Sequence, residues 1–284
     1  MKRILVVSGS RADYGLLEWP MKVMVETFGP ILRIDLWNKT FEQAFDITSR
    51  KLQESPPDVM VILGDRFEIL AAATAAHLQR IPIAHIGGGD VTEGSYDDAM
   101  RDAISRFASI HFVTSTSALA RLSGMGFRNI HLVGNPGIDF IRHADWKRER
   151  PIESPYVVVS YQPETLDGTN DLVKLCADLP VNKHWVMIGP NPDRGSDEIR
   201  DFMRALAKER EGCTYHDYLP HAEFLNMLAH CDEFIGNSSS MLYEAPELGI
   251  KTRMIGKRQK GRTIPWGDGN ASKRIVNILR YTIP

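Results

Sequence analysis

Carboxylates follow two of the short apolar runs in this chain, where they could act as acids or bases. Asp65 and Arg66 follow the run 59–63 after a single glycine. The glycine-rich residues 87–98 carry further carboxylates, which include Asp90, Asp97 and Asp98. Compact folds seldom keep so long a loop unless it has a function. Pairing of Asp65 and Arg66 with neighbouring charges is the structural alternative. Calcium is disfavoured because the D-x-[DN]-x-[DN]-G spacing is missing.

Small and hydroxyl-bearing residues at two other turns suggest an anion site. Residues 8–15 read SGSRADYG, with Arg11 as a cation, and residues 236–240 read GNSSS. Main-chain amides at the start of a helix favour phosphate groups. Glu244 lies four positions after the last serine and can accept hydrogen bonds from a ribose diol. A tight turn at 8–15 and a solvated glutamate at 244 are the simpler alternatives, whereas helix capping explains one serine but not three.

The elements that position these residues are short apolar strands that alternate with helices. Strands that are apolar on both faces are typical of a buried parallel sheet. The helical stretches include 67–80, which is rich in alanine, and 241–248, which follows the GNSSS turn. The expected strands are 4–7, 59–63, 81–86, 110–113 and 130–133, then 156–160, 185–188 and 233–236.

The strand pattern restarts after the polar, proline-containing residues 143–155. At roughly 150 residues per domain, 284 residues suggest two domains. We therefore expect an α/β fold with two doubly wound, Rossmann-like domains, 1–142 and 143–284, and a ligand cleft between them. Residues 9–11, Asp65, 87–98 and Gln162 are expected on one side of the cleft, and 237–244 on the other.

Composition narrows the ligand classes. A net charge of −2 provides no global field for nucleic acid or an anionic membrane, so the default partner is a small molecule. Three cysteines without metal-ligand spacing favour a reducing cytoplasm. No run of about 18 apolar residues and no signal peptide is present, so we expect no membrane segment. No metal or other cofactor is expected.

Taken together, these motifs resemble the UDP-N-acetylglucosamine 2-epimerases, especially the hydrolysing, sialic-acid-pathway branch. The matching segments are 8–15, 64–68, 85–98, 163–166, 195–197, 236–240 with Glu244, 258–262 and 267–272. The resemblance implies the glycosyltransferase-B architecture, with a C-terminal helix, about 270–281, packing back on the first domain. It implies that the sugar is handled by Asp65, Asp97, Asp90, Arg66 and Gln162. It also implies that UDP is bound by Arg11, Asn237, Ser238, Ser239, Ser240, Glu244 and Arg262.

The chain departs from the family pattern at three histidines. Gly87, Asp102 and Gln162 stand in their places, and none of them offers an imidazole for proton transfer near neutral pH. The chain also looks shortened at 29–41 and 262–267. On a helix, Asp98 and Asp102 would share a face, and their like charges would raise one pKa. This pair is one way to regain a near-neutral proton donor.

Two reaction classes follow from the resemblance. The first is a hydrolysing 2-epimerase, which uses UDP-N-acetylglucosamine and yields N-acetylmannosamine and UDP through carboxylate chemistry. The alternative is a glycosyltransferase that passes the sugar to an acceptor hydroxyl on a glycan, a metabolite or a modified nucleic acid, with Asp65, Asp90 or Asp97 as base. A nucleotide-sugar-binding remnant without activity is the third interpretation. The sequence leaves a homo-oligomer open.

Overall fold

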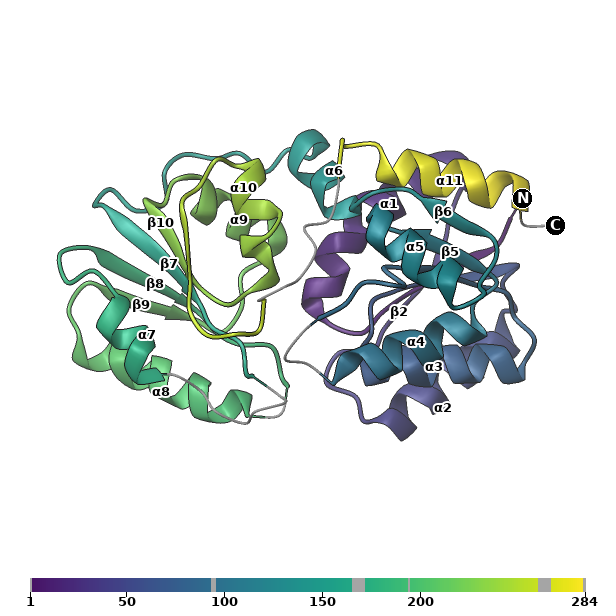
Figure 1. Cartoon of the computed structure of the whole chain (residues 1–284), viewed down its shortest axis with the longest axis horizontal. Coiled ribbons are helices and arrows are strands. Elements are labelled where there is room, and N and C mark those ends of the chain that lie inside the picture. Colours follow the sequence, from purple (N-terminus) through teal and green to yellow (C-terminus); the bar gives the residue numbers. More distant parts are fainter. Residues whose placement is uncertain (1, 93–95, 165–171, 194, 260–266, 283–284) are drawn as a thin grey trace. The chain divides into compact units, whose positions relative to one another are not determined.

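The computed structural model describes residues 2–92, 96–164, 172–193, 195–259 and 267–282. They form two compact units, each built around one parallel sheet (Figure 1). Of the described residues, 2–91, 97–144 and 267–282 make the first unit, and 92, 96, 145–164, 172–193 and 195–259 make the second. The α/β fold class is confirmed. The described C-terminal residues 267–282 belong to the first unit, so the chain returns to this unit after the second.

The first unit contains a six-stranded parallel sheet in the order β2-β1-β3-β4-β5-β6. Its central strands are buried along their whole length because both faces carry aliphatic side chains that helices cover. The elements are β1 (Ile4–Ser8), α1 (Arg11–Phe28), β2 (Leu32–Asp35), α2 (Phe41–Glu54), β3 (Val59–Leu63), α3 (Phe67–Leu78), β4 (Ile83–Ile86), α4 (Asp97–Phe107), β5 (Ile110–Val113), α5 (Thr116–Gly124), β6 (Ile130–Leu132), α6 (Pro136–His143) and α11 (Ala271–Thr282).

The second unit contains a five-stranded parallel sheet in the order β11-β10-β7-β8-β9. Its central strand, β7, is buried throughout, as is its neighbour β10. The elements are β7 (Tyr156–Ser160), α7 (Leu172–Asp178), β8 (His184–Ile188), α8 (Ser196–Glu209), β9 (Cys213–His216), α9 (His221–Ala229), β10 (Glu233–Gly236), the 3₁₀ turn η1 (Ser239–Met241), α10 (Glu244–Glu247) and β11 (Thr252–Met254).

Both sheets have a topological switch point, where successive connections leave one strand in opposite directions. In the first unit, β1 lies between β2 and β3, and in the second unit β7 lies between β8 and β10. Ligands of doubly wound sheets bind outside the carboxyl ends of the strands at such points. The turns after β1 and β3, and those after β7 and β10, are therefore where functional side chains are expected.

The predicted helix 241–248 is wrong. The turn η1 comes first, and α10 begins only at Glu244. Pro246 explains the break, because a proline inside a continuous helix would clash with the carbonyl group four residues earlier. Within the first turn of a new helix, its missing N–H group costs nothing.

The helix α11 packs with α1 and α6 in the first unit (Figure 1). Its residues Ile275, Val276 and Leu279 are buried in the core that also holds Ile4 of β1. The Asp139 carboxylate of α6 accepts hydrogen bonds from the main-chain N–H groups of the first two residues of α11, at 3.1 and 2.6 Å. Within the described part of the chain, no helix is long and apolar enough to cross a membrane.

Candidate functional site

Asp13, which follows β1, lies beside Gly64, the residue between β3 and Asp65. Asp13 lies in the first turn of α1, where its N–H group donates to the Ser10 Oγ at 3.2 Å. A Cβ atom at Gly9 would lie 3.2 Å from the Asp13 Oδ2, and one at Gly64 would lie 4.0 Å from the Oδ1. The carboxyl group thus lies against both turns of the switch point.

The environment of Asp13 favours its protonated form. Its Oδ2 is buried, and no residue that the structure describes donates a hydrogen bond to it. Burial raises the pKa of Asp13 to about 7, against the opposing effects of Arg66 and Ser10. Asp13 therefore titrates near neutrality, a property that the sequence suggested for other residues. Its place in the SGSRADYG turn was the available signal in the sequence, but no role was predicted for it.

Arg101 of α4 organises the remaining carboxylates. Its side chain is only 2% exposed, and it contacts the carboxylates of Asp65 and Asp98 and the main-chain carbonyl of Asp90. Burial opposes its charge, but the neighbouring carboxylates outweigh that effect and raise the pKa of Arg101. The guanidinium thereby joins the ends of β3 and β4 to α4. Arg101 lies between the segment 85–98 and Asp102, which the sequence singles out, but its central place was not predicted.

Asp90 and Arg66 have partners of their own. The Thr114 Oγ1, after β5, lies 3.0 and 3.1 Å from the two carboxylate oxygens of Asp90. Arg66 forms an ion pair with Glu68 at 3.1 Å. We use the name first-unit cluster for the set of charged residues at this sheet edge, namely Asp13, Asp65, Arg66, Glu68, Asp90, Asp98 and Arg101. Asp97 is the first residue of α4, and its assignment to the sugar stays a prediction.

The expected like-charge pair of Asp98 and Asp102 is wrong. Asp98 contacts Arg101, whereas Asp102 forms two hydrogen bonds of 2.7 Å with Arg121 of α5. Each carboxylate thus faces its own arginine, and the helix spacing alone did not show that α5 supplies one. The near-neutral carboxyl group is Asp13 instead.

His85 supports the turn that carries Asp65. Its Nε2 donates to the Gly64 carbonyl at 2.7 Å, so its Nδ1 accepts from the Ser105 hydroxyl at 3.0 Å. The side chain is fully buried, and burial lowers the pKa of His85 to about 4. A neutral imidazole therefore fixes the main chain next to Asp65 and carries no charge into the site.

In the second unit, Gln162 and Asn237 join the ends of β7 and β10. The Asn237 side chain accepts from the Gln162 N–H at 2.5 Å and donates to its carbonyl at 2.8 Å, and Asn237 is 0% exposed. The Gln162 Oε1 accepts from the Asn191 N–H at 2.9 Å. Gln162 therefore lies with residues 237–244, and the expectation that it faces them from the other side was wrong. Its assignment to the sugar stays a prediction. The Asn237 side chain therefore forms hydrogen bonds within the protein through both its oxygen and its nitrogen, and its assignment to UDP stays a prediction.

The serine turn leads into a buried carboxylate. Ser238 and Ser239 are half-buried, and the Ser238 Oγ accepts from the Ser240 N–H at 3.3 Å. Glu244, the first residue of α10, is 3% exposed, so the solvated alternative for it is wrong. Its Oε1 accepts from the Nε2 of His221 at 2.9 Å. Its Oε2 is buried and bonded to none of the described residues. His221 is a residue that the sequence argument missed.

The structure describes only one of the two arginines that were predicted to bind UDP. Arg11, the first residue of α1, is exposed, and its guanidinium lies 5.8 Å from the centre of the Trp37 ring. Arg262 lies outside the described residues. Both assignments stay predictions.

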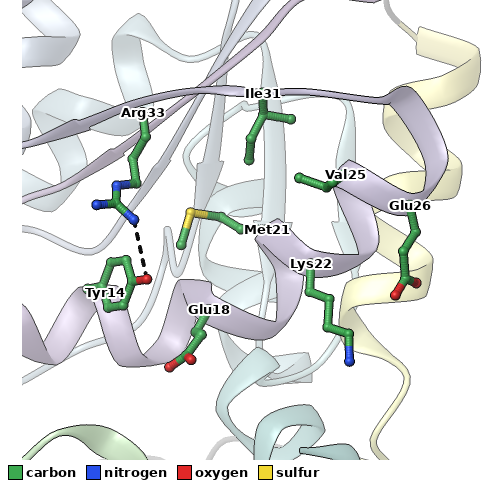
Figure 2. Close-up of a pocket in the computed structure, with 8 residues that line it drawn as sticks. All are labelled: Tyr14, Glu18, Met21, Lys22, Val25, Glu26, Ile31 and Arg33. Atoms are coloured by element: carbon green, nitrogen blue, oxygen red, sulfur yellow. Dashed lines mark hydrogen bonds between the residues drawn. The ribbon is translucent and has the colours of Figure 1, made fainter.

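A groove of about 540 Å³ lies elsewhere on the first unit, between α1 and β2 (Figure 2). Met21, Val25 and Ile31 form its apolar part, and the Arg33 guanidinium donates to the Tyr14 hydroxyl at 3.3 Å. No member of the first-unit cluster lines it. Among the residues with assigned positions, no group of three or more His, Cys, Asp or Glu side chains could hold a metal ion.

Comparison with known proteins found one matching family model and several relatives. The family model described as UDP-N-acetylglucosamine 2-epimerase matches residues 38–264. Escherichia coli polysialic acid biosynthesis protein P7 is 28% identical over 92% of this chain and 80% of that protein. The Legionella pneumophila UDP-N,N'-diacetylbacillosamine 2-epimerase (hydrolyzing) is 27% identical over 92% of this chain and 83% of that protein.

Solved structures share the fold. The Methanocaldococcus jannaschii UDP-GlcNAc 2-epimerase in complex with UDP-GlcNAc and UDP has a TM-score of 0.79 at 16% identity, over 98% of this chain and 99% of that chain. The Neisseria meningitidis UDP-GlcNAc 2-epimerase bound to UDP-GlcNAc has a TM-score of 0.76 at 16% identity, with the same coverage of both chains.

Proposed function

Because the chain belongs to the UDP-N-acetylglucosamine 2-epimerase family, we propose that it is a hydrolysing 2-epimerase, which converts UDP-N-acetylglucosamine and water to N-acetylmannosamine and UDP. The observation that supports this chemistry best is the first-unit cluster. It places the Asp65 carboxylate at the switch point of the sheet and fixes it with the buried guanidinium of Arg101.

The proposed reaction has an elimination step and an addition step. Asp65 removes the C2 proton, and the electron pair of the C2–H bond forms the C1–C2 double bond. The C1–O bond breaks at the same time, so that UDP leaves with the bonding electrons. Water then adds to C1 and gives a proton to Asp97, and the Asp97 carboxylic acid returns a proton to C2 on the face opposite Asp65. The proton that Asp65 removed passes to solvent. Asp13, about half protonated at pH 7, carries less negative charge toward the substrate diphosphate than an ordinary aspartate would.

The second unit is proposed to hold the nucleotide. Ser238 and Ser239 offer hydroxyl and amide donors for the diphosphate. Arg11, which belongs to the first unit, and Arg262 stay the predicted cations for this group. The buried Glu244 Oε2 needs hydrogen-bond donors, which the ribose hydroxyls supply. The free thiols of Cys176, Cys213 and Cys231 suit a cytoplasmic enzyme.

The decisive experiment is incubation with UDP-N-acetylglucosamine in deuterated water, followed by NMR of the released sugar. We expect free N-acetylmannosamine with deuterium at C2, and loss of that product in Asp65→Asn. Asp145→Asn is the matched control, because the side chain of Asp145 is 93% exposed. UDP-N,N'-diacetylbacillosamine, the substrate named for the Legionella relative, should be assayed alongside to compare sugars.

A different sugar product would contradict this proposal. Free N-acetylglucosamine that keeps its C2 proton would mean direct hydrolysis without epimerisation. That result would favour the glycosyltransferase alternative, because a transferase without its acceptor can pass the sugar to water.

A further inference from the structure

The second unit contains a buried histidine–glutamate pair. His221 begins α9 and Glu244 begins α10, so the pair joins two short helices that follow different strands. The Nε2 to Oε1 distance is 2.9 Å, and the side chains are 10% and 4% exposed. Nε2 must carry the proton of this hydrogen bond, because a carboxylate oxygen only accepts.

The pair uses only one of the two Glu244 oxygens. Oε2 is buried, and among the described residues nothing donates to it. A buried carboxylate oxygen without a donor is unfavourable, so this arrangement is suited to a ligand that brings hydroxyl groups. The position agrees with that ligand, because Glu244 follows the serine turn at the switch point between β7 and β10.

We propose that His221 is a positioning residue for nucleotide recognition: its hydrogen bond to Oε1 fixes the Glu244 carboxylate so that Oε2 accepts from the ribose hydroxyls. The substrate class read at this point is therefore a ribonucleoside diphosphate rather than its deoxy analogue. This inference rests on the proposed function, since it assumes that the second unit binds UDP.

The physical basis is preorganisation. A carboxylate already held in one rotamer loses little conformational freedom when the ribose binds, and a deoxyribose leaves its oxygen unpaired in a buried place. Without the imidazole, the Glu244 side chain can rotate toward other donors. Discrimination between ribose and deoxyribose should then fall in a protein that is still folded.

The test compares UDP with 2'-deoxyuridine diphosphate by calorimetric titration of the full chain. We expect wild-type protein to bind UDP about tenfold or more tightly than the deoxy analogue. His221→Phe keeps a planar ring but has no N–H group, and we expect this ratio to fall to about twofold. His221→Gln keeps a donor of similar reach and should restore most of the ratio. Glu244→Gln is the reference for a lost acceptor and should also reduce the ratio.

Each alternative outcome has a distinct meaning. An unchanged ratio in a folded His221→Phe protein would overturn the role of His221. Equal binding of the two nucleotides by wild-type protein would overturn ribose recognition by Glu244 and leave UDP binding intact. Failure of wild-type protein to bind UDP would instead contradict the proposed function. If His221→Phe does not fold, a ratio in His221→Gln that differs from wild type as strongly as that of Glu244→Gln would overturn the proposal.

Discussion

At the scale of single residues, Asp13 is the group whose ionisation should be visible in the stability of the protein. Its pKa rises from 3.8 to about 7 on folding, so between these values the folded protein holds a proton that the unfolded chain has released. The free energy of unfolding therefore falls as the pH rises from about 4 to about 7, and this contribution is constant above that range.

Asp13→Asn removes this titration while keeping the size of the side chain. Compared with wild type, the variant should gain at most about 4 kcal/mol of stability between pH 4 and pH 8. Urea unfolding of both proteins across this range measures the difference. Asp145→Asn, a change at a carboxylate that is 93% exposed, is the control. Parallel stability curves for Asp13→Asn and wild type would show that Asp13 does not titrate as described.

At the scale of elements, Arg101 connects α4 to the turns after β3 and β4. Arg101→Lys keeps the charge but loses the planar fork that contacts Asp65 and Asp98 together. Misplacing a reacting group by about 1 Å can cost roughly 100-fold in rate, so we expect kcat to fall by about that factor. Arg121→Lys is the matched control, because its pair with Asp102 is partly exposed, and kcat should stay within about twofold. Equal rates in the two variants would contradict the role of Arg101.

The approach of β10 to β7 depends on Gly236. A Cβ atom there would collide with the Ser160 carbonyl, and the φ of Gly236 is +142°. Gly249 has a φ of +71° but no atom within 4 Å of its Cβ position. Gly236→Ala should therefore lower the free energy of unfolding by at least about 2 kcal/mol more than Gly249→Ala, measured by urea unfolding. Equal losses would show that backbone strain, not the close approach, requires glycine at 236.

At the scale of the whole molecule, the chain returns to its first unit after completing the second. Ile275 of α11 is fully buried in the core of the first unit. Ile275→Ala should cost about 2–5 kcal/mol and lower amide hydrogen-exchange protection in β1 and β3, with β7 and β8 unaffected. Leu175→Ala, in a core of the second unit, should show the opposite pattern. Loss of protection across both units in either variant would mean that they unfold as one.

The sequence by itself determined the central strands and the turns that follow them. Val59–Leu63, Ile110–Val113, Tyr156–Ser160 and Glu233–Gly236 have the bounds predicted from their apolar runs. A strand that is buried on both faces needs apolar side chains throughout, so a continuous apolar run marks it clearly in the sequence. The edge strands β2, β9 and β11 were missed, because they are only partly buried and mix charged or polar residues with apolar ones.

Only the tertiary structure decided which polar residues act together. The buried contacts of Arg101 with Asp65, and of His221 with Glu244, join residues 36 and 23 positions apart in the chain. Burial shifts the pKa of Asp13, and its carboxyl group lies against turns that follow two different strands. Local spacing reveals helix faces and strand ends, but which loops meet at a switch point follows from strand order. Strand order is a property of the folded sheet. It decides which charged residues meet at the site, and therefore the electrostatics there.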